Sequence, residues 1–233
     1  METNSSSLKN TARFAGLLYL ILVITGIYGI MYLPSQFIVM GDTVTTAKNI
    51  LSNEFLFRTG AINDVISNTI FLFLVFVLYR LLKQVNENQA RLMFALVIVQ
   101  IPVVFIVEAF NITSLMILKG EILKTFELSQ RQDLAMLLLK INDFGTLPLE
   151  MFWGLWLLPF GLLVYKSEFI PRIFGILLVI AGIAYMIDST IALLIPDYSV
   201  FVNKPTLLFA AIGEISITLW LLIKGVKTQE RKI

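Results

Sequence analysis

The stretch PRIFGILLVIAGIAYMIDSTIALLI, residues 171–195, decides the fold class of this chain. After Arg172 it contains one charged residue, Asp188, and most of its other side chains are apolar. A helix of about 20 apolar residues crosses the hydrocarbon core of a membrane, which is about 30 Å thick. The stretch therefore predicts a membrane-spanning helix, and the prolines at 171 and 196 suit its two ends.

Five further stretches have similar length and character, and the overall composition agrees with them. Of the 233 residues, 58% are hydrophobic and 15% are charged, and the mean hydropathy is +0.85. A soluble domain contains about 25% charged residues. We therefore predict an all-α polytopic membrane protein, a single domain (1–233) with six transmembrane helices in one bundle. The spans are expected at 14–33, 61–82, 92–118, 144–165, 171–195 and 206–223.

Prolines predict where the helices end or bend. Pro34 is expected to close the first span. Pro102, Pro148 and Pro159 lie within the third and fourth spans, where the missing N–H and the bulk of the ring predict kinks.

Two loop segments have the spacing of amphipathic helices, at about 43–52 and 130–141. Asp42 is expected to cap the first, and a capping-box pattern precedes the second. We expect both to lie on the outer interface of the membrane, with anchoring favoured over a lid-like role. Gly175 and Gly182, seven residues apart in the fifth span, predict a close contact with a neighbouring helix.

Basic residues are distributed unevenly between the loops. The side that holds both termini has 11 Lys and Arg residues, and the opposite side has 7 in longer loops. The positive-inside rule then places both termini in the cytoplasm, and a bacterial cytoplasmic membrane is the expected location. The 11 residues are Lys9, Arg13, Arg80, Lys83, Arg91, Lys166, Arg172, Lys224, Lys227, Arg231 and Lys232, and the 7 are Lys48, Arg58, Lys119, Lys124, Arg131, Lys140 and Lys204.

Five acidic residues lie within the predicted spans, and no basic residue accompanies them at comparable depth. A charge near the centre of a bilayer costs about 2.5–3.5 kcal/mol on insertion scales, so such residues face a protein interior or a watery cavity. With both termini inside, all five fall in the outer half of the membrane. The simplest packing forms an acidic cavity open to the outside from Asp64, Glu108, Glu150, Asp188 and Glu214.

Structural roles compete with this interpretation. Asp64 and Asp143 are expected near helix N-termini, where a carboxylate caps free N–H groups. The deeper acids either cross-link helices or bind a proton, a cation or a small amine. Asn111 shares a helix face with Glu108, and Arg58 near the outer rim is a candidate for partial charge compensation.

The residue types that are absent exclude several classes of protein. The chain has no Cys and no His, which excludes disulfides, thiolate metal sites, thiol nucleophiles and the usual general base. We expect no cofactor, leave a metal site undecided, and expect no nucleic-acid binding, because the basic residues are sparse and explained by topology. Membrane lipids are the expected partners of the C-terminal basic residues.

The order of several short motifs resembles a known family. The first span contains Arg13-x-Ala15-Gly16-Leu17-Leu18-Tyr19, and later motifs are Leu56-Phe57-Arg58, Tyr185-x-Ile187-Asp188-Ser189 and Gly213-Glu214. In combination they are similar to the bacterial six-span membrane proteins of the domain of unknown function 4386 family. The resemblance covers nearly the whole chain. The resemblance implies a compact six-helix membrane protein, and it implies no particular activity. It favours Asp42, Arg58, Asp188 and Glu214 as residues of a shared site.

Three function classes follow from the sequence. The first is binding or transport of a proton, cation or small amine through the outward-facing carboxylates, coupled to movement at the proline-kinked third and fourth helices. The second is a non-catalytic accessory or sensor subunit whose acids hold the bundle together. The third is a carboxylate-dependent intramembrane hydrolase, although no Gly-x-Gly-Asp signature of the paired-aspartate proteases occurs. We expect that the protein is not an enzyme.

Overall fold

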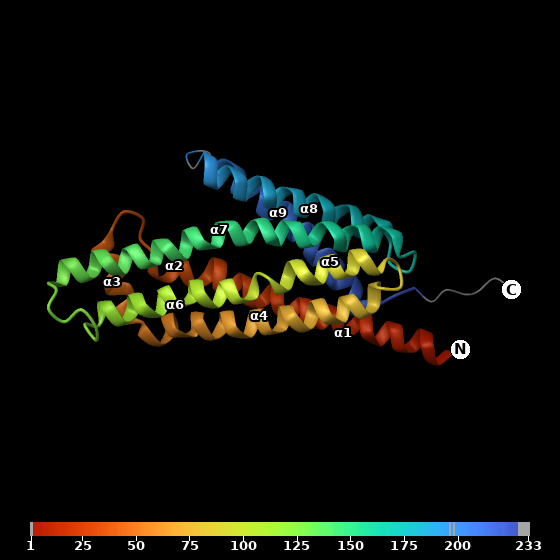
Figure 1. Cartoon of the computed structure of the whole chain (residues 1–233), viewed down its shortest axis with the longest axis horizontal. Coiled ribbons are helices and arrows are strands. Elements are labelled where there is room, and N and C mark those ends of the chain that lie inside the picture. Colours follow the sequence, from red (N-terminus) through yellow and green to blue (C-terminus); the bar gives the residue numbers. More distant parts are fainter. Residues whose placement is uncertain (1, 196, 198, 228–233) are drawn as a thin grey trace. The chain divides into compact units, whose positions relative to one another are not determined.

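The fold is all-α, as the sequence predicts. The computed structural model describes residues 2–195, 197 and 199–227, with side chains described for 7–195, 197 and 205–227, and these residues form helices without a β-strand (Figure 1). Pro196, Arg231, Lys232 and the side chain of Lys204, all used in the sequence-based predictions, lie outside this description.

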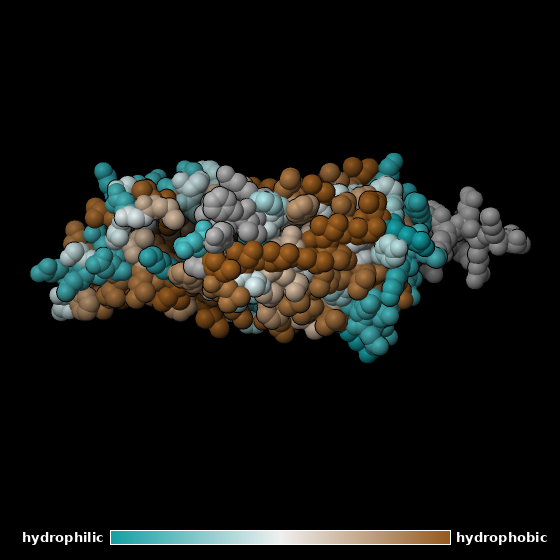
Figure 2. Space-filling model, turned by 90° about the horizontal axis from the view of Figure 1, so that it is seen from above, coloured by the Kyte–Doolittle hydropathy of each residue, from teal (hydrophilic) through white to brown (hydrophobic). Residues whose placement is uncertain are grey.

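Six of the helical segments are long and apolar enough to cross a membrane, which makes this a multi-pass membrane protein. Each has at least 19 residues, close to the length that the hydrocarbon core requires. Figure 2 shows how much hydrophobic surface these segments expose on one face. The six are Ser7–Phe37, Glu54–Leu82, Glu87–Leu118, Leu128–Lys166, Arg172–Leu194 and Pro205–Ile223.

The first membrane helix continues past the proline that was expected to close it. It consists of α1 (Glu2–Gly26), a π-helical segment η1 (Ile27–Tyr32) and α2 (Leu33–Phe37). In the π segment, the N–H of Leu33 donates to the carbonyl of Tyr28, five residues back. Pro34 then stands in the first turn of α2, a position where its missing N–H costs little. The predicted end at Pro34 is therefore wrong by one helical turn.

The third membrane helix is broken where a proline predicts a kink. It consists of α5 (Glu87–Ile98) and α6 (Ile101–Leu118), separated by Val99 and Gln100. The ring of Pro102 would clash with the carbonyl four residues earlier, that of Ile98, and this clash explains the break. The kink predicted for the third helix is thus confirmed.

The fourth membrane helix, α7 (Leu128–Lys166), is one uninterrupted helix of 39 residues. It runs through Pro148 and Pro159 without a break, and it includes the segment 130–141 that the sequence placed in a separate interfacial helix. No glycine or proline occurs between 128 and 144, so nothing in the chain ends the helix there. Asp143 consequently lies in mid-helix, and its predicted role as an N-terminal cap is wrong.

The remaining helices are close to their predicted positions, with two earlier starts. They are α3 (Thr43–Ser52), α4 (Glu54–Leu82), α8 (Arg172–Leu194) and α9 (Ser199–Ile223). α4 begins seven residues before the predicted start at 61, and α9 begins seven residues before the predicted start at 206. α8 follows Pro171 directly, as the sequence predicts.

The sequence predicts one domain, and the structure divides the chain into two compact units. Unit 1 comprises Met1–Val23, Ile70–Gln100 and Leu147–Ile233, and unit 2 comprises Ile24–Thr69 and Ile101–Thr146. The core of unit 2 includes Phe37, Ile50, Leu115 and Leu139. Because Ile50 of α3 is fully buried there, α3 is held by protein packing as well as by its apolar character.

Asp42 caps α3 in the way that the sequence predicts. Its Oδ1 accepts from the N–H of Thr45 at 2.9 Å, and the hydroxyl of Thr45 donates to Oδ2 at 2.6 Å. The hydroxyl of Thr45, followed by its N–H, lowers the pKa of Asp42. The cap therefore stabilises the folded state above the ordinary aspartate pKa of about 3.9, and this contribution is lost as the pH falls through the lowered folded pKa.

Hydrogen exchange tests the cap. We expect the substitution Asp42→Ala to speed exchange at the first-turn amides of α3, Val44 to Thr46, at neutral pH. Asp42→Asn keeps an acceptor oxygen, so it should preserve protection and remove its dependence on acid pH. Equal protection of these amides in the wild type and the Ala variant would contradict a capping role.

Glycines set the contact between α7 and α8 in unit 1. Gly154 faces Gly182, and Gly161 faces Gly175, so the two backbones touch at two levels seven residues apart. A Cβ at Gly175 would lie 2.6 Å from both the Gly161 carbonyl oxygen and the Tyr165 nitrogen. The close helix contact predicted for Gly175 and Gly182 is confirmed. Small residues are common where membrane helices pack closely, because they let the two backbones approach each other.

Substitution of Gly175 tests this contact. Gly175→Ala should destabilise the protein by about 1–3 kcal/mol, because backbone atoms cannot move aside for the new methyl group. Gly26→Ala is the matched control, since Gly26 has a helical φ of −63° and nothing within 4 Å of its Cβ position. The control should be neutral or slightly stabilising. Melting temperatures in one detergent give the comparison, and equal values for the two variants would refute tight packing at Gly175.

Candidate functional site

Glu214 of α9 lies between two tyrosine hydroxyl groups in unit 1. Tyr19 of α1 donates to its Oε2 at 2.8 Å, and Tyr185 of α8 donates to its Oε1 at 3.0 Å. Both oxygens of one carboxylate are therefore engaged by protein groups from two other helices. This arrangement replaces the water that a carboxylate loses when it enters an apolar environment.

Aromatic rings hold the two tyrosines in place. Tyr19 is fully buried and its ring lies 6.1 Å from that of Trp156, which is 2% exposed. Trp156 in turn contacts Phe71 and stacks on Phe160 at 5.4 Å. The edge-to-face contact of Tyr185 with Trp153, at 6.1 Å, orients the second hydroxyl. Trp156 is thus a packing residue.

Two further acids act on the same tyrosine. The carboxyl groups of Glu150 and Asp188 both lie within electrostatic range of the hydroxyl of Tyr185. Asp188 lies one turn after Tyr185 on α8 and is 4% exposed. The hydroxyl of Ser189 donates to the carbonyl of Leu147 at 2.6 Å, which ties this part of α8 to the turn of α7 that contains Glu150. The structure therefore groups three of the predicted acids around Tyr185. We call Tyr19, Glu150, Tyr185, Asp188 and Glu214 the Tyr185 cluster.

The other two predicted acids lie in unit 2 and pair with each other. Asp64 of α4 and Glu108 of α6 form a side-chain hydrogen bond. Asn111 donates to Glu108 Oε2 at 2.9 Å, which confirms the shared face of these two residues. A hydrogen bond between two carboxyl groups requires a proton on one of them. One proton shared by the two carboxyl groups would satisfy this requirement and leave the pair with at most one negative charge.

Asp64 is not a helix cap, contrary to one of the sequence-based interpretations. α4 begins at Glu54, so Asp64 lies ten residues inside the helix and its turn has no free N–H groups to satisfy. Asn68 donates to the backbone carbonyl of Asp64 at 2.9 Å, and Asn63 donates to that of Thr25 at 3.1 Å. These amides hold the backbone around Asp64, while its carboxyl group is hydrogen-bonded to Glu108.

Arg58 forms an ion pair within its own helix. Its Nε lies 2.8 Å from Oε1 of Glu54, which also accepts from Lys119 at 3.0 Å. Lys119 contacts Glu121 at 2.8 Å, and these two carboxylates raise the pKa of Lys119. The four side chains are partly exposed, so solvent weakens the pairs.

The tyrosines of the cluster are candidate site residues that reasoning from charge missed. Tyrosine is neutral and common in membrane helices, so nothing in composition distinguishes Tyr19 or Tyr185 from other aromatic residues. One signal was present in the sequence. Tyr185 lies three residues before Asp188, and both tyrosines occur within the family motifs.

Among the described residues, no group of three or more His, Cys, Asp or Glu side chains is arranged to hold a metal ion. The Tyr185 cluster instead combines hydroxyl donors, carboxylates and aromatic faces. Such a set of groups can exchange protons or receive a small organic cation.

The fold and these buried acids define a multi-pass, all-helical membrane protein with carboxyl groups inside its helix bundle. The chain belongs to the family described as "Domain of unknown function (DUF4386)", which matches residues 14–225. It is 34% identical over 90 residues to an "Uncharacterized protein" of Archaeoglobus fulgidus. That match covers 39% of this chain, and the chain spans about half (49%) of the length of this relative. No solved structure matches the chain.

Infrared spectroscopy tests the Asp64–Glu108 pair. The proton between the carboxyl groups should give a protonated-carboxyl C=O band at neutral pH, and Glu108→Gln should remove it. Glu121→Gln, at a partly exposed acid that is paired with Lys119, is the control and should leave the band unchanged. A band of equal intensity in the wild type and Glu108→Gln would show that these two residues do not share a proton.

Proposed function

We propose that the Tyr185 cluster binds a proton or a small amine within the membrane, as part of a binding or transport protein. The observation that carries this proposal is the Glu214 carboxylate held by the hydroxyls of Tyr19 and Tyr185, with Glu150 and Asp188 acting on the same Tyr185. Three acids at one tyrosine concentrate negative charge in an environment where charge is costly. A bound proton or cation offsets that cost.

The aromatic surroundings favour an organic cation over a metal ion. Trp153 and Tyr185 present ring faces and edges beside the carboxylates, and an ammonium group is attracted to the faces of such rings. The two tyrosine hydroxyls donate to Glu214. An arriving ammonium group would take over these hydrogen bonds as a donor, so that the carboxylate is satisfied in both states.

The proposal includes the orientation and location of the protein. With both termini in the cytoplasm of a bacterial cell, the cluster would open toward the outer half of the cytoplasmic membrane. Transport would require movement of the helices, and the break before Pro102 between α5 and α6 is a place where backbone angles can change.

A second candidate is an accessory or sensor subunit whose acids only hold helices together. One observation favours it. The Glu214 carboxylate accepts from tyrosines of two other helices, and these two hydrogen bonds link α1, α8 and α9. Polar contacts of this kind contribute about 0.6 kcal/mol each, up to about 2 kcal/mol, between membrane helices.

Thermal stability in detergent separates these two candidates. Under the binding proposal, a saturating small alkylamine raises the melting temperature by several degrees, because a ligand at 100 times its Kd stabilises by about 2.7 kcal/mol. Glu214→Gln should abolish this increment, and Glu121→Gln should keep it. Under the accessory candidate, Glu214→Gln lowers the melting temperature and the amine has no effect on any variant. Absence of any amine or pH effect on the wild type would overturn the binding proposal.

A further inference from the structure

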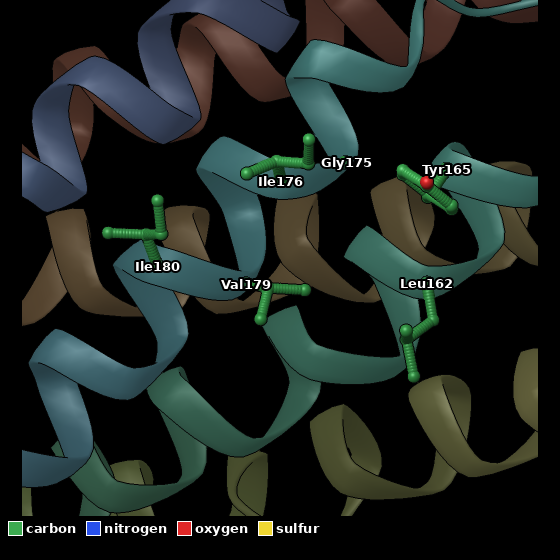
Figure 3. Close-up of a pocket in the computed structure, with 6 residues that line it drawn as sticks. All are labelled: Leu162, Tyr165, Gly175, Ile176, Val179 and Ile180. Atoms are coloured by element: carbon green, nitrogen blue, oxygen red, sulfur yellow. The ribbon is translucent and has the colours of Figure 1, made fainter.

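An apolar hollow lies between α7 and α8 on the surface of unit 1. It has a volume of about 240 Å³ and is lined by Leu162 and Tyr165 of α7 and by four residues of α8, which are Gly175, Ile176, Val179 and Ile180 (Figure 3). Gly175 has no side chain, and its backbone touches α7 at Gly161. The larger side chains on either side therefore stand above a depression.

A second hollow lies further along the same two helices. Its volume is about 380 Å³, and its lining includes Leu158 of α7 and Ile183 and Ile187 of α8. Together with Ile176 and Ile180, these isoleucines follow the helical repeat along one face of α8. The lined stretch of α8 runs from Gly175 to Ile191, over which the helix rises about 24 Å. One leaflet of hydrocarbon, half of the core, is about 15 Å thick.

The end of the first hollow is basic. Tyr165 lines it, and the guanidinium of Arg172 lies over the Tyr165 ring at 5.6 Å from its centre. Lys166 follows Tyr165 and is exposed. The backbone N–H of Lys227 donates to the carbonyl of Phe169 at 2.9 Å, which brings a third basic residue to this loop. Glu168 is the acid within the loop, so the net charge of these residues is positive.

We propose that the two hollows between α7 and α8 hold one acyl chain of an anionic glycerophospholipid, whose phosphate lies at Arg172. The lining is apolar apart from the hydroxyl-bearing Tyr165 and Thr190, the lined stretch is long enough to cross one leaflet, and the charge at its end is opposite to that of a phosphate group. Arg172 suits this role, because a guanidinium binds a phosphate through paired N–H donors while its face stays on an aromatic ring. The site is separate from the Tyr185 cluster and does not depend on its function.

Native mass spectrometry of the full chain, released from detergent after incubation with phosphatidylglycerol or phosphatidylcholine, tests the proposal. The wild type should retain one lipid per chain and prefer phosphatidylglycerol. Ile176→Phe and Ile180→Phe fill the hollow and should each remove the retained lipid. Ile173→Phe is the control, because Ile173 is exposed on α8 and does not line either hollow.

The headgroup is tested separately. Arg172→Gln should reduce the preference for phosphatidylglycerol over phosphatidylcholine by about fivefold, the effect of one basic residue near an anionic surface. Arg80→Gln, at an exposed arginine of unit 1 that does not line either hollow, should leave it unchanged. Circular dichroism verifies that each variant keeps its helix content.

Two results would overturn the proposal. The first is unchanged lipid retention in both phenylalanine variants. The second is a second copy of the chain, in place of a lipid, in the wild-type spectrum. An unchanged headgroup preference in Arg172→Gln would refute the assignment of the phosphate to Arg172.

Discussion

The backbone contacts made by glycines are the constraint on which unit 1 depends. Inside a membrane, burial of apolar surface gives little force for packing, so close van der Waals contact carries more of the association. Four of the five residues of the Tyr185 cluster lie within about one turn of such contacts. Gly16 packs on the backbone of Leu222 three residues before Tyr19, and Gly213, which packs on α8, precedes Glu214. Gly182 and Gly154 pack on each other, and they lie three residues before Tyr185 and four residues after Glu150.

The two units use their acids in different ways. In unit 2, Asp64 and Glu108 are hydrogen-bonded to each other, and Asn111 supports the pair. In unit 1, Glu214 accepts from two tyrosine hydroxyl groups and needs no second acid as a partner. The Tyr185 cluster therefore combines its acids with hydroxyl groups and aromatic rings, whereas the pair in unit 2 consists of two acids and an amide. This difference is why the proposed function rests on the Tyr185 cluster.

The sequence predicts the fold class well and the helix ends less well. Length and hydropathy specify six helices, because the membrane requires about 20 apolar residues in each. The ends at Pro34 and near Asp143 were predicted wrongly for the same reason. A proline in a first turn, or a polar residue in an apolar run, ends a helix only when the neighbouring backbone cannot adapt. At Pro34 the π segment supplies that adaptation, and in α7 nothing interrupts the helix. The cost of burying charge identifies the acids as unusual, but their partners come from different helices and were not visible in the sequence.

The glycine contacts also affect how mutations reach the cluster. Every amino acid that can replace glycine has a larger side chain, so any missense change at Gly154 or Gly182 pushes apart the helices that carry Glu150 and Tyr185. In a genetic screen for loss of activity, these positions should therefore appear beside the acids although they have no chemistry of their own. Across the family, we expect the glycines that set the helix spacing to vary as little as the acidic residues.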